Sequence, residues 1–378
     1  MITTVAQTYP TKKNMYNNGF VHARIKAYLK EEIEANAFVL NNREIKNDYT
    51  IEGVEVLAGN IERLVQYVNE NDQVTCVCFH FLNVSMLKAI QKFRTNVKIV
   101  IFVHGNEALW WYQRIFPDRF SGILRTLKFI KYAVINSFSI FYIRRRINNL
   151  KQQINIICVS EWMRDIALKN WKIDESKVNT HIIPNIVNEE IFKYQKKDED
   201  LRYNILLIRQ FTSGKYALDV AMDIIKKLEE YPEADKIRFT IIGRGWLYKK
   251  YTDRIKEFKN VQFEETFLSQ DEIALRHKEN GIFLCPTRQD AQGVSMCEAM
   301  SSGLVPISSP NTAIPEFLPT SFDLAFDNAD KAAERIIELI RNPSEFSRLS
   351  KAVSDFIHQK CNSKETTVKE IELIKSMR

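Results

Sequence analysis

Short apolar runs of strand length recur along the first half of the chain. They are ITTVAQTYP, VTCVCFHF, KIVIFVHG and INIICVS, which begin at Ile2, Val74, Lys98 and Ile154. The segments between them include FVHARIKAYLKEE, in which apolar residues recur at helical spacing. Continuous apolar runs of this kind are typical of parallel strands that are covered on both faces. The pattern therefore predicts a parallel α/β sheet.

The pattern then restarts in the second half. The strands expected there are NILLIRQ, IRFTIIGRG, GIFLC and LVPISS, and the helices between them include YALDVAMDIIKKLEEY and QDEIALRHKEN. The charged stretch KYQKKDEDLR at 193–202 reads as a linker. We predict two Rossmann-like domains, 1–195 and 196–359, with a C-terminal helix at about 360–378 that can pack back on the first. The carboxyl ends of the two sheets would face a central cleft, where ligands of such folds bind.

Composition and cysteine use agree with this fold class. The chain has 378 residues, of which 45% are hydrophobic, enough for two cored domains. Its six cysteines lie mostly in apolar runs, and Cys76 and Cys78 fit no metal-ligand spacing. The first residues lack the basic start and long apolar core of a signal peptide. We therefore expect buried free thiols in a cytoplasmic protein.

Positive charge gathers in one segment. The net charge is +7, which suits a phosphate-bearing substrate, nucleic acid or an anionic membrane. Residues 109–150 hold eight Lys or Arg, one acid (Asp118) and ten aromatic residues. Two interpretations remain open: a core helix pair with a solvated basic face, or a surface that docks on the inner face of the cell membrane. The apolar run AVINSFSIFYI is too short to span a bilayer, which takes about 20 residues.

Several loops at predicted strand ends carry polar or glycine residues. NNG, ending at Gly19, precedes the first helix and lets backbone approach a ligand. VHGNE places His104 at a strand end, where it can hydrogen-bond a sugar hydroxyl. RQFTSGK places Arg209 and Lys215 around a small polar turn before a helix, which suits a diphosphate. None of these loops matches a dinucleotide fingerprint or a Walker A loop, and each can also be a plain turn.

The segment QDAQGVSMCEAMSSG holds two acids on either side of a glycine-opened helix. Gly293 would begin the helix, leaving the N–H groups of Val294 and Ser295 to cap a phosphate. Glu298 lies one turn further along and can reach sugar hydroxyls, and Asp290 precedes the glycine. The set could hold a nucleotide diphosphate and its sugar, unless Asp290 is a loop acid and Glu298 a solvated helix residue.

These residues carry a resemblance to retaining glycosyltransferases of the GT-B fold, in the large family-four group. DAQGVSMCEAMSSGLVP at 290–306 resembles that family's E-x7-E motif, and IPEF at 314–317 resembles the segment that follows it. CVSEWMRDIALKNWKIDESKVNTHIIPNIVNEEIF and FTIIGRG are similar to further family segments. The resemblance spans about 103–317. It departs from the family at Asp290, where glutamate is usual, and at Gln292, where phenylalanine is usual.

The resemblance implies a role for each candidate. Arg209 and Lys215, with Gly293, Val294 and Ser295, would bind the donor diphosphate, and Glu298 would hold the ribose. Asp290 and His104 would be the catalytic residues at the reacting centre. The further assignments are these: Gly243, Arg244 and Leu268 for the nucleotide; Gly19, His22 and Asn106 for the acceptor side.

We therefore expect a nucleotide-sugar-dependent, retaining glycosyltransferase that needs no metal and no cofactor. The resemblance implies a glycan or lipid-linked acceptor from a bacterial surface polysaccharide such as O-antigen, capsule or lipopolysaccharide, and no nucleic acid. One alternative is an epimerase or phosphorylase of the same fold, which a donor-only assay would reveal. Another is a basic, non-enzymatic protein that binds membrane or nucleic acid, which would not bind a free nucleotide diphosphate saturably.

Overall fold

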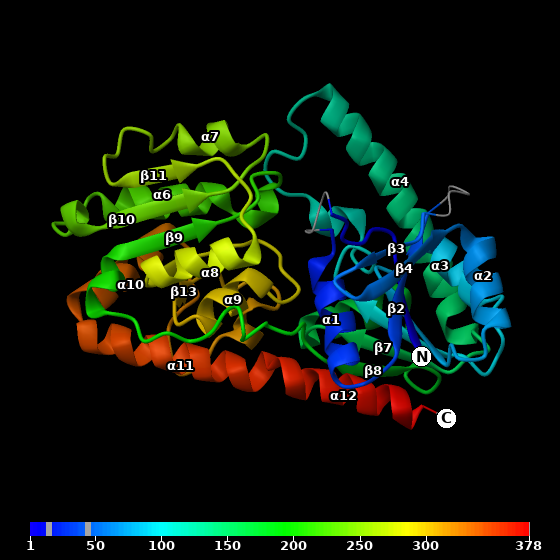
Figure 1. Ribbon diagram of the computed structural model, residues 1–378. Helices are drawn as coiled ribbons and strands as arrows, with labels where there is room; N and C mark the ends of the chain where they lie inside the picture. The colour runs from blue at the N-terminus through cyan, green and yellow to red at the C-terminus, as the bar shows by residue number, and fades with distance from the viewer. Residues whose placement is uncertain (13–16, 42–46, 378) are drawn as a thin grey trace. The chain divides into compact units, whose positions relative to one another are not determined.

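The computed structural model describes residues 1–12, 17–41 and 47–377 (Figure 1). The chain divides into two compact units. Unit 1 comprises Met1–Arg114, Ile130–Ile186 and Ser363–Arg378, and unit 2 comprises Ile115–Phe129 and Val187–Asn362. The division after Ile186 differs from the expected boundary at 195/196, since the linker 193–202 lies within unit 2. Residues 115–129 also group with unit 2, although the sequence placed them in the first domain.

The described strands of unit 1 form one eight-stranded sheet in the order β3-β4-β2-β1-β5-β6-β7-β8. Its strands are β1 (Ile2–Ala6), β2 (Ala35–Leu40), β3 (Tyr49–Ile51), β4 (Val54–Gly59), β5 (Cys76–His80), β6 (Lys98–Val103), β7 (Ile154–Cys158) and β8 (Asn179–Ile182). All neighbours are parallel except β3 and β4. Every residue of β1, β5 and β7 is buried, as expected for strands covered on both faces.

Helices cover the sheet of unit 1, and one of them comes from the C-terminus. The helices are α1 (Gly19–Lys30), α2 (Ile61–Glu70), α3 (Val84–Ile90), α5 (Glu161–Trp171), α12 (Ser363–Ser376) and most of α4 (Ile123–Arg146). α12 packs against α1, and α2 packs against α3. Arg24 of α1 forms a buried ion pair with Glu370 of α12 at 2.9 Å, and the Tyr28 hydroxyl donates to the same carboxylate at 2.6 Å. These contacts hold the C-terminal helix on unit 1.

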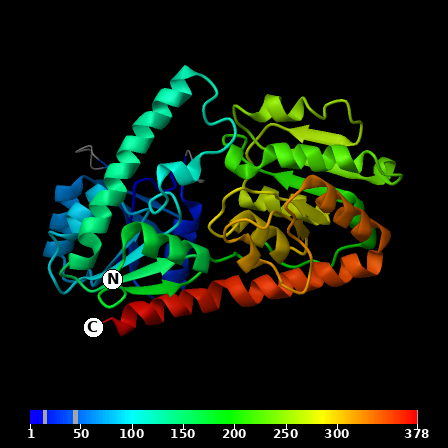
Figure 2. The same cartoon turned by 180° about the vertical axis from the view of Figure 1, so that it is seen from behind.

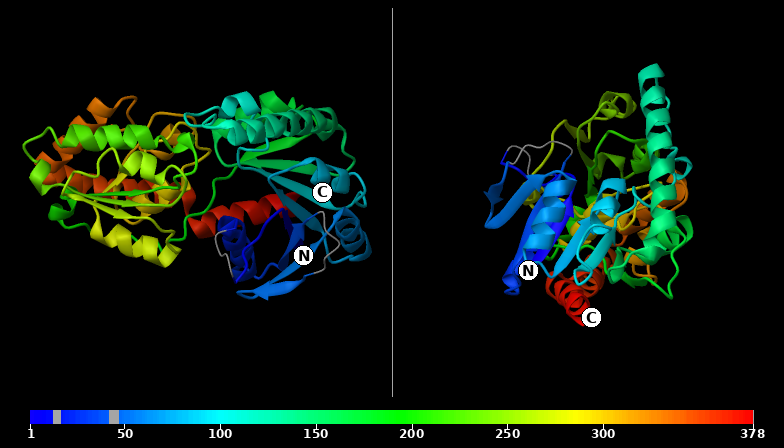
Figure 3. Two further views of the ribbon diagram at one scale, coloured as in Figure 1. Left: turned by 90° about the horizontal axis from the view of Figure 1, so that it is seen from above. Right: turned by 90° about the vertical axis from the view of Figure 1, so that its right-hand side faces the viewer.

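Unit 2 contains a five-stranded parallel sheet in the order β11-β10-β9-β12-β13. The strands are β9 (Asn204–Ile208), β10 (Arg238–Ile242), β11 (Val261–Glu264), β12 (Ile282–Leu284) and β13 (Val305–Ile307). The helices are α6 (Leu218–Leu228), α7 (Tyr248–Thr252), α8 (Gln270–Glu279), α9 (Val294–Ser301), α10 (Ala329–Arg341) and α11 (Pro343–Cys361). α6 and α8 lie on opposite faces of this sheet (Figure 3, left). The strand order reverses its direction at β9, so the chain has a topological switch point between β9 and β12.

The long helix α4 is uninterrupted from Ile123 to Arg146 (Figure 2). Its first seven residues, 123–129, group with unit 2, and the rest group with unit 1. The described helices include none whose length and apolar character would let it cross a membrane. The six cysteines are free and buried, as their apolar surroundings predicted.

Candidate functional site

Arg209 lies at the switch point of unit 2, directly after β9. Its side chain is 8% exposed, and its guanidinium donates to the Ser295 hydroxyl at 2.5 Å and to the Cys285 carbonyl at 3.2 Å. Its Nε has no acceptor, and it forms no ion pair with an acidic side chain in the described parts of the chain. Burying a charge without a counter-charge is unfavourable. The site therefore favours an anion beside Arg209.

Lys215 lies on the turn between β9 and α6, and this turn is held by Arg288. The Arg288 backbone N–H donates to the Lys215 carbonyl at 2.7 Å, and its guanidinium donates to the Gly214 carbonyl at 2.9 Å. The same guanidinium forms a bidentate pair with Asp219. The Lys215 ammonium lies 4.8 Å from the centre of the Tyr216 ring. Arg288 thus positions the Lys215 turn, a role that the sequence analysis missed because nothing local links the two loops.

In the part of the chain that the structure describes, two backbone donors at the N-terminus of α9 lack acceptors. Gly293 has a φ of 77°, and a Cβ there would lie 2.8 Å from the Ile314 side chain, so the position requires glycine. The Asp290 carboxylate accepts the N–H groups of Gly293 at 2.9 Å and Gln292 at 3.3 Å. Among the described residues, the next two N–H groups, those of Val294 and Ser295, have no acceptor. Together with Arg209, which bonds the Ser295 hydroxyl, they form an anion-binding corner.

Glu298 is half-buried on α9, one turn beyond these donors. Its carboxyl group has no hydrogen-bond or ionic partner in 1–12, 17–41 or 47–377, and burial raises its pKa to about 8. A carboxyl group that the fold leaves without a partner can accept hydrogen bonds from the hydroxyls of a ligand. This environment differs from that of Asp290, whose carboxylate already holds loop N–H groups.

The other predicted nucleotide residues follow β10 and β11. Gly243 packs on the chain beside Arg209, since a Cβ at this glycine would lie 1.9 Å from the Arg209 carbonyl oxygen. The Arg244 carbonyl accepts the Phe211 N–H at 3.1 Å, which ties the two loops together. Leu268 is half-buried beyond the end of β11. Unit 2 therefore brings its predicted residues to the carboxyl end of one sheet.

In unit 1, His104 pairs with a second histidine. The Nε2 of His104 lies 2.8 Å from the Nδ1 of His80, which ends the neighbouring strand β5. The rings stack, and burial lowers the pKa of both well below the usual range, so both are neutral near pH 7. Phe20, at the start of α1, packs edge-on against His104 with ring centres 4.9 Å apart. His80 was missed, although it too stands at a strand end, because only the register of β5 and β6 reveals the pair.

The remaining candidates of unit 1 differ in their surroundings. Gly19 begins α1 and has open space beside its Cα. Asn106 is exposed in the loop after β6. His22 is buried, and its two ring nitrogens face the Tyr9 hydroxyl at 2.8 Å and the Glu52 carboxylate at 3.4 Å. Both polar atoms of His22 are engaged within the fold, so its surroundings are those of a structural histidine.

Residues 202–342 match the family model of the glycosyl transferases group 1. This stretch lies in unit 2 and carries Arg209, Lys215, Asp290 and Glu298. Over 180 residues, 44% of this chain, the sequence is 26% identical to the gpi3 subunit of phosphatidylinositol N-acetylglucosaminyltransferase from Schizosaccharomyces pombe. The alignment spans 36% of the length of that relative.

Solved structures match over nearly the whole chain. A glycosyltransferase from Rickettsia africae gives a TM-score of 0.69 at 15% identity, covering 100% of this chain and 98% of its own. HepE from Anabaena, crystallised with UDP and glucose, gives 0.67 at 11% identity, covering 99% of each chain. At these identities the likeness concerns the fold. It confirms the predicted fold class, two Rossmann-like α/β domains of the GT-B type.

Proposed function

We propose that the protein is a glycosyltransferase that uses a nucleotide-diphosphate sugar as donor. The observation that carries this proposal is the buried Arg209, which has no acidic partner among the described residues and lies beside the open N–H groups of Val294 and Ser295. Positive groups with no internal counter-charge suit a diphosphate, which would complete them. The family match over unit 2 and the fold shared with HepE, whose crystals hold UDP and glucose, support this choice.

In the proposed reaction, the anomeric configuration is retained. The bond between the anomeric carbon and the donor phosphate oxygen breaks, and the acceptor hydroxyl oxygen bonds to the same face of that carbon. The hydroxyl proton passes to the departing phosphate, so the products are a glycoside and a nucleoside diphosphate. Arg209, Lys215 and the α9 N–H groups would stabilise the charge that develops on the leaving group, and we therefore expect no requirement for a metal.

The carboxyl groups and His104 take different parts in this proposal. Glu298 would bind the ribose and Asp290 would orient the transferred sugar. We favour the leaving phosphate as the base, because one oxygen of Asp290 is already engaged with the loop N–H groups. The neutral His104 would exchange hydrogen bonds with a sugar hydroxyl. We propose that the acceptor is a glycan or a lipid-linked molecule of a bacterial surface-polysaccharide pathway. The protein would act in the cytoplasm, at the inner face of the cell membrane.

A thermal-shift screen of nucleotides and nucleotide sugars tests the donor assignment. Ligand at 100 times its dissociation constant should stabilise the protein by about 2.7 kcal/mol. Arg209→Ala should abolish the shift, and Arg238→Ala, an exposed arginine of the same unit, should preserve it. No shift with any nucleotide would refute the proposal. Consumption of the donor without an acceptor, by mechanisms other than hydrolysis, would favour an epimerase or phosphorylase.

A further inference from the structure

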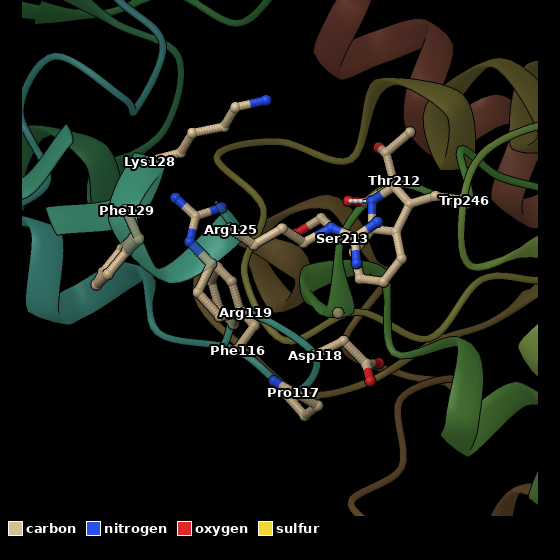
Figure 4. Close-up of a pocket in the computed structure, with 11 residues that line it drawn as sticks. Phe116, Pro117, Asp118, Arg119, Arg125, Lys128, Phe129, Thr212, Ser213 and Trp246 are labelled. Carbon is tan, nitrogen blue, oxygen red and sulfur yellow. Dashed lines mark hydrogen bonds between the residues drawn. The ribbon is translucent and has the colours of Figure 1, made fainter. Parts of the chain in front are cut away.

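A basic pocket lies within unit 2, beside the loop that carries Lys215 and lined in part by Thr212, Ser213 and Gly214 of that loop. It encloses about 200 Å³ between the segment 116–129 and the loops that follow β9 and β10 (Figure 4). Arg119, Arg125 and Lys128 line it, and the Arg125 side chain extends to Trp246. This volume can hold several water molecules, so a phosphate group fits.

The charges of this pocket remain positive. Its one acidic lining residue, Asp118, bonds the Lys250 ammonium through one carboxylate oxygen and the Tyr251 hydroxyl through the other. The Arg125 guanidinium stacks on the Trp246 ring, with its central carbon 3.5 Å from the ring centre. Stacking orients a guanidinium and leaves its charge in place. Lys128 forms no ion pair with any residue that the structure describes.

The helix that carries two of these cations also has an exposed apolar face. Six of the eight large apolar residues exposed on α4 recur in steps of three and four, which places them on one face. They are Ile123, Leu127, Ile130, Val134, Phe138 and Phe141, and they reach 79% exposure at Ile123 and 65% at Val134. The other two, Leu124 and Ile135, each follow a residue of this face and widen it along one edge. The opposite face of the helix is buried at Phe129, Ile140 and Ile143. An apolar stripe that no described residue covers is unusual for a soluble surface.

The charge pattern of α4 indicates which partner covers this stripe. The helix has no Asp or Glu, and its cations include Lys131 and Arg144–Arg146. A second copy docking through the same stripe would bring these cations against each other. An anionic membrane would instead receive the apolar residues at the boundary of its acyl chains and the cations at its headgroups. Arg145 already stacks on Phe141 at 4.8 Å, as at such an interface.

We propose that the exposed face of α4 docks on an anionic lipid membrane and that the pocket beside it binds the phosphate of a lipid headgroup. Successive residues of an α-helix are about 100° apart around its axis. Lys128 therefore lies beside the stripe, next to the edge that is nearer Leu127. That position suits a cation at headgroup level when the stripe faces the acyl chains. The pocket shares the loop 212–214 with the donor site, but the residues that the test changes, Lys128, Leu127 and Val134, are outside the donor set.

Vesicle sedimentation of the full chain tests the proposal with phosphatidylglycerol in phosphatidylcholine against phosphatidylcholine alone. Wild type should prefer the anionic vesicles, and added salt should weaken this binding. Lys128→Gln should lower it more than the roughly fivefold expected from losing one surface cation. The matched control is Lys131→Gln, one turn away and outside the pocket, which should show only that fivefold loss. Leu127→Gln with Val134→Gln should lower binding about tenfold or more, whereas exposed Leu275→Gln in α8 should not.

Four contrary results would each refute one part of this proposal. Equal binding to neutral and anionic vesicles would refute the docking. Equal losses of vesicle binding for Lys128→Gln and Lys131→Gln would refute headgroup binding in the pocket. Only a general electrostatic attraction to the membrane would then be left. Displacement from vesicles by millimolar glycerol 3-phosphate, but not by sodium chloride of equal ionic strength, would make it a site for soluble phosphates. Concentration-dependent dimers in light scattering that Leu127→Gln disperses would assign the stripe to a second copy. Unchanged thermal midpoints would show that the variants are folded.

Discussion

Replacing Glu298 by glutamine should stabilise the ligand-free protein while weakening nucleotide binding. Burial raises the pKa of this carboxyl to about 8, compared with about 4.5 for an exposed glutamate. Between these two values the folded state binds a proton that the unfolded state does not. The stability of the wild type should therefore fall as pH rises from about 4.5 to 8. Glutamine has the same shape and no charge, so it escapes this loss.

The size of the effect follows from the two pKa values. Between pH 4.5 and pH 7 the change is about 2.5 pH units, and each unit corresponds to about 1.4 kcal/mol, which gives a ceiling of about 3.5 kcal/mol. The side chain is only half-buried, so water screens part of its charge, and we expect about 1–2 kcal/mol. For a domain of this size, that gain raises the melting temperature by about 3–6 °C. At pH 5 the difference should nearly vanish.

The assay is thermal unfolding of wild type, Glu298→Gln and Glu265→Gln from pH 5 to 8.5. Glu265 is an exposed carboxylate of the same unit, and its variant should follow the wild type. Calorimetry with a nucleoside diphosphate completes the test. For its carboxylate to accept the ribose hydroxyls, Glu298 must lose its proton. The affinity of the wild type for the nucleotide should therefore rise by up to about tenfold per pH unit towards pH 8. The affinity of Glu298→Gln should not show this rise. A melting difference that does not grow with pH would refute the burial argument, and equal affinities would remove the ribose role.

Two further predictions concern the diphosphate and the sugar. Arg209→Ala and Lys215→Ala should each lower turnover at least tenfold with the fold intact, since one transition-state charge contact is worth about 2.7–4 kcal/mol; initial rates against Arg238→Ala check this, and near wild-type rates in both would disprove the clamp. Asp290→Asn should cut transfer strongly and leave nucleotide affinity nearly unchanged, as measured by product formation and calorimetry. Unchanged transfer would show that this acid serves only the loop.

The sequence predicted eight of the strands, whose continuous apolar runs leave a strong local pattern. Each predicted apolar run became a strand, from β1, β5, β6 and β7 to β9, β10, β12 and β13. The strands β2, β3, β4, β8 and β11 were not predicted. β8 and β11 have no fully buried residue and so leave a weak pattern, but β2 and β4 have four buried residues each and were missed despite their burial. The grouping of residues 115–129 with unit 2 was also missed. It depends on pairs such as Asp118 with Lys250, which are 132 positions apart.

The candidate site shows the same division between local and distant information. The helix that begins after Gly293 could be predicted because Gly293, the backbone donors after it and Glu298 are close in sequence. The contacts that position the site could not be predicted from the sequence. Arg288 holds the Lys215 turn across a separation of 74 residues, from Arg288 to Gly214, and His80 meets His104 only through the register of two strands. Residue types thus indicated the chemistry, and only the fold revealed the residues that position it.

The aspartate at 290, where glutamate is usual in the resembling family, has a physical explanation in the loop that it occupies. A short carboxylate can fold back onto N–H groups two and three residues further along, as in the turns that aspartate favours. Asp290 does so with Gln292 and Gly293. A glutamate would carry its carboxylate one methylene further and would lose this fit. The same bonds hold Gly293 in the left-handed conformation that opens α9, so Asp290 shapes the anion-binding corner even before any sugar is bound. Asparagine keeps an oxygen for these bonds, so Asp290→Asn separates the loss of charge from the loss of loop geometry.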